Sequence, residues 1–182
     1  MTVAERVATY IQAKDSNRPH LMSAAFAPHA RLDIVVNSGT ISFPPRTTGL
    51  DAIANVLVSR FGQVHENVYT FCLCPPPSLD QSTFSCTWLV GMSEKDGGAV
   101  RIGCGRYDWA FSSEGARLVD HLRVTIERME TLPSSELPTV INWLVRLPYP
   151  WCATDAALET MPKLKQLQDI ARHLSQVQRE DA

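Results

Sequence analysis

The sequence predicts an α+β domain in which helices cover one face of a mostly antiparallel sheet, followed by a C-terminal helical extension. Three observations support this fold class. Apolar residues recur at helical spacing in the first third of the chain. Stretches rich in β-branched and aromatic residues then follow one another between residues 68 and 129, separated by turn-forming sequences. After Pro133 the apolar spacing becomes helical again.

The N-terminal part is expected to contain three helices and one strand. Residues 3–14 form the first helix, which ends at the polar residues 15–17. Pro19 begins a second, short helix that ends near Pro28. Residues 31–36 alternate polar and apolar side chains, which predicts a strand, and residues 39–48 form an extended loop. The apolar spacing over residues 50–61 predicts a third helix, which ends at Gly62.

Later strands are expected at residues 68–74, 83–92, 100–111 and 118–129. The turns between them contain Pro or Gly, so that successive hairpins form an antiparallel meander. Helices on one face of such a sheet define the α+β class. We therefore expect a core domain over residues 1–132. Residues 133–182 form the extension, whose apolar helical stripe packs on the domain itself or on a dimer partner.

Composition places the chain among ordinary globular proteins. Its 182 residues, 45% of them apolar and 20% charged, can bury a core without a disulfide or metal. The net charge is −2 and the basic residues are scattered, so we expect neither a nucleic-acid partner nor a membrane partner. Glu5 and Arg6 give the N-terminus an amphipathic character unlike a signal peptide, which predicts a cytoplasmic location.

The five cysteines are an odd number and none forms a CxxC motif, so the chain suits a reducing compartment. Cys72 and Cys74 are two residues apart and would face the same side of a strand. Two interpretations remain open for them. They are either small buried residues of the strand or a thiolate pair that binds a metal. We favour the first interpretation.

Two short segments carry a resemblance to a known family. Asp15-Ser16 is followed ten residues later by the segment from Ala27 to Asp33, and Asp108-Trp109 is followed by Gly115. These segments, and the order of helices and strands, resemble the nuclear transport factor 2-like superfamily over residues 3–130, in particular SnoaL-like proteins and scytalone dehydratase. The resemblance implies a cystatin-like cone, in which a curved sheet encloses a small-molecule pocket and no metal or organic cofactor is used.

The same resemblance implies a set of site residues. Asp15 matches the catalytic aspartate of the dehydratase, and His65 lies two residues from the place of a family histidine, which here is Gln63. Lys14 and Ile34 replace tyrosines, and the position of a second histidine falls near Gly91 or Met92. The implied catalytic pair is therefore Asp15 and His65. The implied substrate-binding residues are Tyr10, Phe26, Ile34, Asn67, Trp88, Cys104 and Arg106.

Each of these assignments has a structural alternative. Asp15 is either a general acid/base whose pKa burial raises or a solvated residue at a helix end. Arg106 either recognises an anion or carbonyl of a ligand or forms an internal pair with Asp108. His121 on the last strand lies either on the concave face of the sheet or outside it, and the sequence leaves both open.

Two functions from different classes follow. The first is a SnoaL-like small-molecule-binding protein that acts as a lyase (dehydratase) or isomerase on a cyclic or polyketide-like substrate. The second is a non-catalytic binding or assembly subunit, similar to the small β subunits of ring-hydroxylating dioxygenases. A fold by itself does not choose between them. We also expect a homodimer through the outer sheet face, because the long strands carry apolar residues on both faces.

Overall fold

A strongly curved sheet forms the centre of the computed structural model, which describes residues 1–39, 41–78, 81–113 and 115–180. Within these residues the sheet has six strands in the order β2-β1-β6-β5-β4-β3. Its strands are β1 (Phe26–Val36), β2 (Arg46–Thr48), β3 (His65–Cys72), β4 (Thr83–Glu94), β5 (Val100–Phe111) and β6 (Val119–Leu132). The run β3 to β6 is the expected antiparallel meander.

Strand β1 differs from the sequence-based expectation. It begins at Phe26, upstream of the expected start, and it pairs in parallel with β6. The pairing shifts register between Phe26 and Arg31, and this bulge accommodates Pro28, which has no N–H to donate to a ladder. Pro28 therefore lies within a strand, and the expected second helix is a short 3-10 turn, η1 (Pro19–Ala24).

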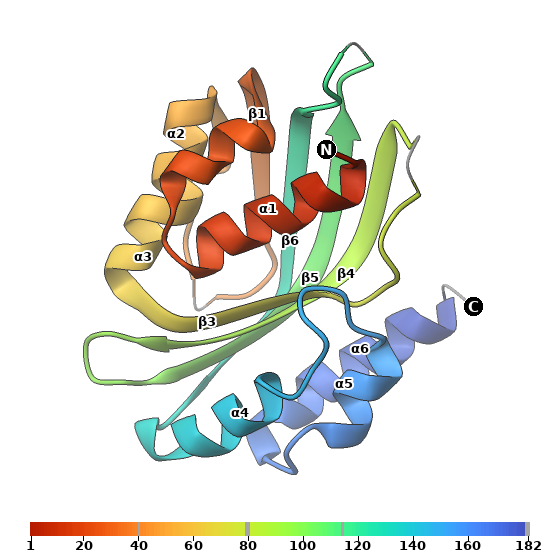
Figure 1. Cartoon of the computed structure of the whole chain (residues 1–182). Coiled ribbons are helices and arrows are strands. Elements are labelled where there is room, and N and C mark those ends of the chain that lie inside the picture. The colour runs from red at the N-terminus through yellow and green to blue at the C-terminus, as the bar shows by residue number, and fades with distance from the viewer. Residues whose placement is uncertain (40, 79–80, 114, 181–182) are drawn as a thin grey trace.

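The first layer of helices covers the concave face of the sheet (Figure 1). Helix α1 (Val3–Asp15) begins at a capping box, in which Thr2 and Glu5 each accept the other's backbone N–H. Helix α2 (Leu50–Ala54), a π-helical turn η2 (Asn55–Ser59) and helix α3 (Arg60–Val64) form a continuous helical stretch. The helix expected at residues 50–61 is thus present and extends to Val64.

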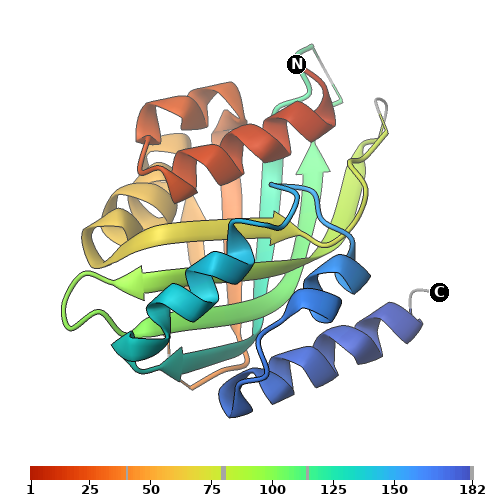
Figure 2. The ribbon, with the colours of Figure 1, turned by 60° about the horizontal axis from the view of Figure 1, so that its bottom comes forward.

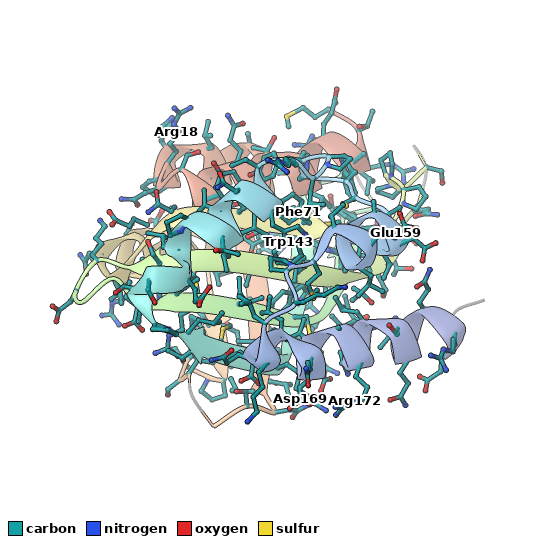
Figure 3. The ribbon with its side chains drawn as sticks, turned by 90° about the horizontal axis from the view of Figure 1, so that it is seen from below. Arg18, Phe71, Trp143, Glu159, Asp169 and Arg172 are labelled. Carbon is teal, nitrogen blue, oxygen red and sulfur yellow. The ribbon has the colours of Figure 1, made fainter. Side chains whose placement is uncertain are left out.

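A second layer of helices covers part of the outer face (Figure 2). These helices are α4 (Leu137–Leu144), α5 (Thr154–Thr160) and α6 (Gln168–Glu180), joined through the short 3-10 turns η3 (Ser134–Glu136) and η4 (Lys165–Leu167). Phe71 of β3 and Trp143 of α4 belong to a core between this layer and the sheet (Figure 3). The sheet thus buries apolar side chains on both faces, and a separate core lies inside the cone.

Curvature brings the backbones of β5 and β6 very close at one point. Both strands pair with a register shift beside Gly105. A Cβ atom on Gly105 would overlap the carbonyl oxygen of Thr125 and press on the Trp88 ring. Only glycine therefore permits this approach. The bend directs Tyr107 and Trp109 of β5 into the cone core.

Candidate functional site

A cavity of about 50 Å³ lies inside the cone, between the first layer of helices and the concave face. Its walls are formed mainly by aliphatic and aromatic side chains. They come from α1, β1, the loop after β1, the α2–α3 stretch and strands β4 to β6: Tyr10, Lys14, Ile34, Ile41, Phe43, Leu57, Phe61, Trp88, Val90, Met92, Tyr107, Val124, Ile126 and Met129. A cavity of about 10–15 Å³ holds one water molecule. This cavity therefore has room for a few water molecules, and a ligand of the size of a six-membered ring requires the walls to move.

Lys14 is the cationic residue of this wall. Its Nζ donates to Asp15 Oδ1 at 2.6 Å and to Thr70 Oγ1 at 2.7 Å. The same Nζ lies 4.9 Å from the centroid of the Phe61 ring, a cation–π distance. An ammonium group has three N–H donors, and these two oxygens accept two of them. The third N–H has no acceptor among the described residues, and Lys14 lines the cavity.

Asp15 lies beside Lys14, and its carboxylate is enclosed by donors. Oδ2 accepts the backbone N–H of Thr70 at 2.7 Å and the hydroxyl of Tyr149 at 3.0 Å. Oδ1 accepts the Thr70 hydroxyl at 2.8 Å as well as Lys14. The side chain is 4% exposed. A carboxylate at the C-terminal end of a helix opposes the helix dipole, so the Lys14 charge and these hydrogen bonds together stabilise it there.

Tyr10 and Tyr107 form a second polar element of the cavity wall. Their hydroxyls are hydrogen-bonded, and burial raises the pKa of both groups well above the ordinary value for tyrosine. Both hydroxyls are therefore protonated at neutral pH. Trp88 lines the same cavity and is 4% exposed, and its Nε1 has no hydrogen-bond partner among the described residues. A buried donor without an acceptor is costly, so a ligand oxygen would be favoured here.

His65 lies outside this cavity, at the start of β3. Its ring centroid is 4.5 Å from that of Phe61, and burial lowers its pKa. The imidazole lines a neighbouring groove of about 320 Å³, which shares Ile41, Phe43 and Phe61 with the cavity wall. The hydrogen bonds to Asp15 within the described chain come from Lys14, Thr70 and Tyr149. His65 and Lys14 therefore contact the same aromatic residue, Phe61, and Asp15 has no direct hydrogen bond to His65 among the described residues.

The other residues implied by the resemblance divide into two groups. Tyr10, Ile34 and Trp88 line the cavity, and Phe26 packs behind it with its ring 5.7 Å from that of Tyr10. Cys104 and Arg106 lie on the opposite face of β5. Cys104 belongs to the outer core.

Polar partners hold the remaining expected residues away from the cavity. Arg106 Nε donates to Asp108 at 2.9 Å, which is the internal pair that the sequence left open. Asn67 is exposed and donates to Ser93 Oγ at 2.9 Å. His121 lies on the outer face, with Nε2 2.7 Å from Asp33 Oδ2. The even-numbered face of β5 is therefore the outer one, which corrects the expectation that Cys104 and Arg106 point into the cone.

Three residues of the site were not predicted from the sequence. Thr70 and Tyr149 hold Asp15, and Tyr107 pairs with Tyr10. Lys14 appeared only as a departure from a family tyrosine. The sequence did contain a signal for the burial of Lys14, because this lysine lies on the apolar side of an amphipathic helix. A charge in that position requires a partner.

The cysteines of the inner face form a chain of thiols. Cys74 donates to Cys86, and Cys86 donates to Cys72. Among the residues that the structure describes, no group of His, Cys, Asp or Glu is arranged to hold a metal ion. The interpretation of Cys72 as a small buried residue of its strand agrees with its zero exposure.

Comparisons with known proteins give matches in structure alone. No protein-family model matches the sequence. No curated protein matches it either. A nuclear transport factor 2-like superfamily protein from Salmonella enterica serovar Typhimurium shares 17% identity at a TM-score of 0.55, over 69% of this chain and 89% of that one.

Two further solved structures show the same likeness. A computationally designed 17-OHP binder shares 15% identity at a TM-score of 0.55, over 72% of this chain and 100% of that one. A protein with a ketosteroid isomerase-like fold from Catenulispora acidiphila, in complex with trimethylamine, shares 13% identity at a TM-score of 0.52, over 66% and 83%. At these identities the likeness concerns the fold.

Proposed function

We propose that this chain, which has the fold of the nuclear transport factor 2-like superfamily, binds a small uncharged molecule that is mostly apolar and carries one oxygen acceptor. The observation that carries the proposal is the position of Lys14 in an otherwise largely apolar cavity wall. Because Asp15 already neutralises this ammonium, a second anion would be in excess. A carbonyl or hydroxyl oxygen suits the remaining N–H of Lys14 and the unpaired Trp88 indole.

The cavity must enlarge to accept such a molecule, and its walls contain the means. Met92 and Met129 line it, and methionine side chains adapt their shape more readily than branched ones. Ile41 and Phe43 belong to the loop after β1, and they separate the cavity from the groove that contains His65. Movement of these two side chains would join the two spaces. Two of the structural neighbours, the designed 17-OHP binder and the protein in complex with trimethylamine, hold or bind small molecules, which supports this use of the fold.

A matched pair of probes tests the proposal. Cyclohexanone and methylenecyclohexane have nearly the same shape, and only the first carries an oxygen acceptor. We expect both to shift the Trp88 indole resonance in an NMR titration, with a preference for cyclohexanone that depends on Lys14. A hydrogen bond from a charged donor contributes about 1.5–3 kcal/mol, which is roughly 10- to 100-fold in affinity.

The decisive variant is Lys14→Met combined with Asp15→Asn, which removes both charges together. We expect the ratio of the two affinities to fall by about tenfold in this variant. The control is Arg106→Met with Asp108→Asn, which removes an ion pair from the outer face. The proposal would be contradicted if the ratio of the cyclohexanone affinity to the methylenecyclohexane affinity were the same in the wild type and in the Lys14→Met, Asp15→Asn variant.

A lyase or isomerase is the second candidate, and the Tyr10–Tyr107 hydroxyl pair favours it. Protonated hydroxyls in an apolar cavity stabilise an enolate oxygen that forms beside them. In this candidate Asp15 and His65 remain the proposed acid/base residues. The test is deuterium exchange at the carbons next to the carbonyl of cyclohexanone in D2O. Exchange that requires the protein and is lost in Asp15→Asn would support catalysis, and its absence would leave binding alone.

We further propose that the chain acts as a monomer, in place of the homodimer expected from the sequence. The apolar part of the outer sheet face is covered by α4 and α6 of the same chain. The uncovered part carries exposed charged side chains, among them Arg31, Arg46 and Arg106. A dimer through this face would have to bury those charges.

The cytoplasmic location expected from the sequence stays a proposal. All five cysteines have free thiols, which supports a reducing compartment. In the described part of the chain, none of the helices combines the length and the apolar character that crossing a bilayer requires.

A further inference from the structure

The connector between α4 and α5 returns to the open edge of the sheet. Strand β3 is one of the two edge strands, and the backbone N–H of Cys72 donates to the Pro150 carbonyl at 2.8 Å. The Cys152 N–H donates in turn to the Cys72 carbonyl at 3.0 Å, so that Trp151 forms a parallel bridge with Cys72. The connector therefore pairs with the backbone of Cys72 at the end of this edge strand, and it holds Tyr149 beside β3.

Tyr149 joins the outside of the molecule to the buried ion pair. Its ring packs against Phe71 and Tyr69, at centroid distances of 5.8 and 6.4 Å. The residue is 47% exposed, yet its hydroxyl donates to Asp15, whose side chain is 4% exposed. The ring also lines a surface groove beside α1. Tyr149 thus lies between Asp15 and solvent.

We infer that Tyr149 is a positioning residue for the cavity inside the cone. Through Tyr149, docking of the connector between α4 and α5 is coupled to ligand binding. This inference rests on the proposed function, because it concerns how Lys14 is presented to the ligand. The chain of contacts is short: Tyr149 donates to Asp15 Oδ2, and Asp15 Oδ1 accepts Lys14 Nζ. Tyr149 itself does not line the cavity.

The physical reason lies in the number of donors on Asp15 Oδ2. Without the Tyr149 hydroxyl, this oxygen keeps only the backbone N–H of Thr70. The carboxylate then rotates or recruits water, and the direction of the Lys14 N–H bonds is no longer fixed by Asp15. Burial and the nearby Asp15 charge raise the pKa of Tyr149, so its hydroxyl remains a donor across the neutral range. Coupling of this kind is reciprocal, so ligand binding also strengthens docking of the connector.

Tyr149→Phe is the test variant, since it removes the hydroxyl and keeps the ring. We expect its affinity for methylenecyclohexane to equal that of the wild type, whereas its affinity for cyclohexanone falls about fivefold, the effect of one hydrogen bond. Tyr69→Phe is the matched control, because it removes a hydroxyl from the adjacent ring, and it should change neither affinity. If Tyr149 had only a structural role, Tyr149→Phe would lower the affinities for both probes by the same factor. That result would overturn the inference.

A second measurement needs no ligand. A buried, hydrogen-bonded ammonium gives a slowly exchanging 1H–15N signal, which is assigned to Lys14 by its loss in the Lys14→Met, Asp15→Asn variant. We expect solvent exchange of this signal to accelerate at least threefold in Tyr149→Phe and to be unchanged in Tyr69→Phe. Unchanged exchange in Tyr149→Phe would overturn the inference.

The two measurements separate the possible failures. If the wild type shows no Lys14-dependent preference for cyclohexanone, the proposed function fails, and the ammonium signal still decides whether Tyr149 positions Lys14. If the wild type shows that preference and Tyr149→Phe retains it in full, the inference fails while the proposed function stands.

Discussion

Lys14 Nζ lies 2.6 Å from Asp15 Oδ1, and both side chains are more than nine-tenths buried. Adjacent residues of a helix do not face each other, so this pair forms only because both side chains turn toward Thr70 on β3. Burying two charges costs free energy that their attraction and hydrogen bonds have to offset. Because Lys14 lines a largely apolar cavity, this ion pair presents a fixed cation to any ligand that enters it.

Removal of one partner of this pair is expected to destabilise the fold more than removal of both. Lys14→Met or Asp15→Asn alone should lower the free energy of unfolding by about 3–5 kcal/mol, because the remaining buried charge then has no opposite charge beside it. The double variant should lose less than the sum of the two single losses. Urea unfolding followed by tryptophan fluorescence measures all three, and additive losses would contradict a coupled pair.

Gly105→Ala is expected to destabilise the protein strongly. The added Cβ would meet the Thr125 carbonyl, which belongs to backbone and cannot yield as a side chain does. Overpacking of this kind costs about 3 kcal/mol. Gly39→Ala is the control, because no atom lies within 4 Å of a Cβ placed there. Thermal unfolding of the two variants should differ clearly, and a Gly105→Ala protein as stable as the control would refute the close approach.

Cys74 is expected to react slowly with iodoacetamide although it is only half-buried. Its hydrogen bond to Cys86, together with burial, raises the pKa of its thiol, and the thiolate is the reactive form. Cys86→Ala removes the acceptor, so the pKa of Cys74 falls and alkylation at pH 8 should accelerate several-fold. Cys104→Ala, a change in the outer core, is the control. Peptide mass mapping identifies the alkylated residue, and equal rates in both variants would contradict this account.

Asp33 is expected to make stability depend on pH in the acid range. The hydrogen bond from Arg46, ahead of the one from His121, holds the pKa of Asp33 below its usual value. The folded state therefore releases this proton more readily than the unfolded state does. The resulting stabilisation is present above the unfolded pKa, near 3.9, and is lost as the pH falls through the lower folded value.

Arg46→Met tests this assignment. The variant should be less stable than the wild type at pH 6, and the difference should shrink toward about pH 2, as the falling pH protonates Asp33 in the folded state as well. Arg172→Met, which breaks an exposed pair with Asp169, serves as the control. Urea unfolding at the two pH values measures the difference, and a constant gap between wild type and Arg46→Met would count against Asp33.

Local patterns in the sequence were sufficient for most of the fold but not for its long-range pairing. The periodicity of residues 50–61 and the four β-rich stretches appear in the structure as the α2–α3 stretch and strands β3 to β6. The parallel pairing of β1 with β6 joins segments some ninety residues apart and has no local signal. The start of β1 was also not predicted, because Pro28 indicated the end of a helix. Proline is found within a strand only at an edge or a bulge, and Pro28 lies at a bulge.

The candidate site was less predictable for a related reason. Strand β5 is buried on both faces, so alternation alone cannot show which face lines the cavity, and Cys104 and Arg106 were assigned to the wrong one. Lys14 and Asp15 acquire their environment from Thr70 and Tyr149, which lie far along the chain. Residues whose role depends on such distant partners require the structure.

Helix α6 is expected to keep the chain monomeric by covering the outer core. Leu174 is 1% exposed and packs into that core. Leu174→Asp would bury an unpaired charge, so α6 should detach and expose apolar residues such as Ile102 and Leu132. Light scattering should give a monomer for the wild type and for the control Gln176→Asp, which lies toward solvent, and larger species for Leu174→Asp. A wild-type dimer that Leu174→Asp leaves intact would show that the outer core is not what sets the oligomeric state.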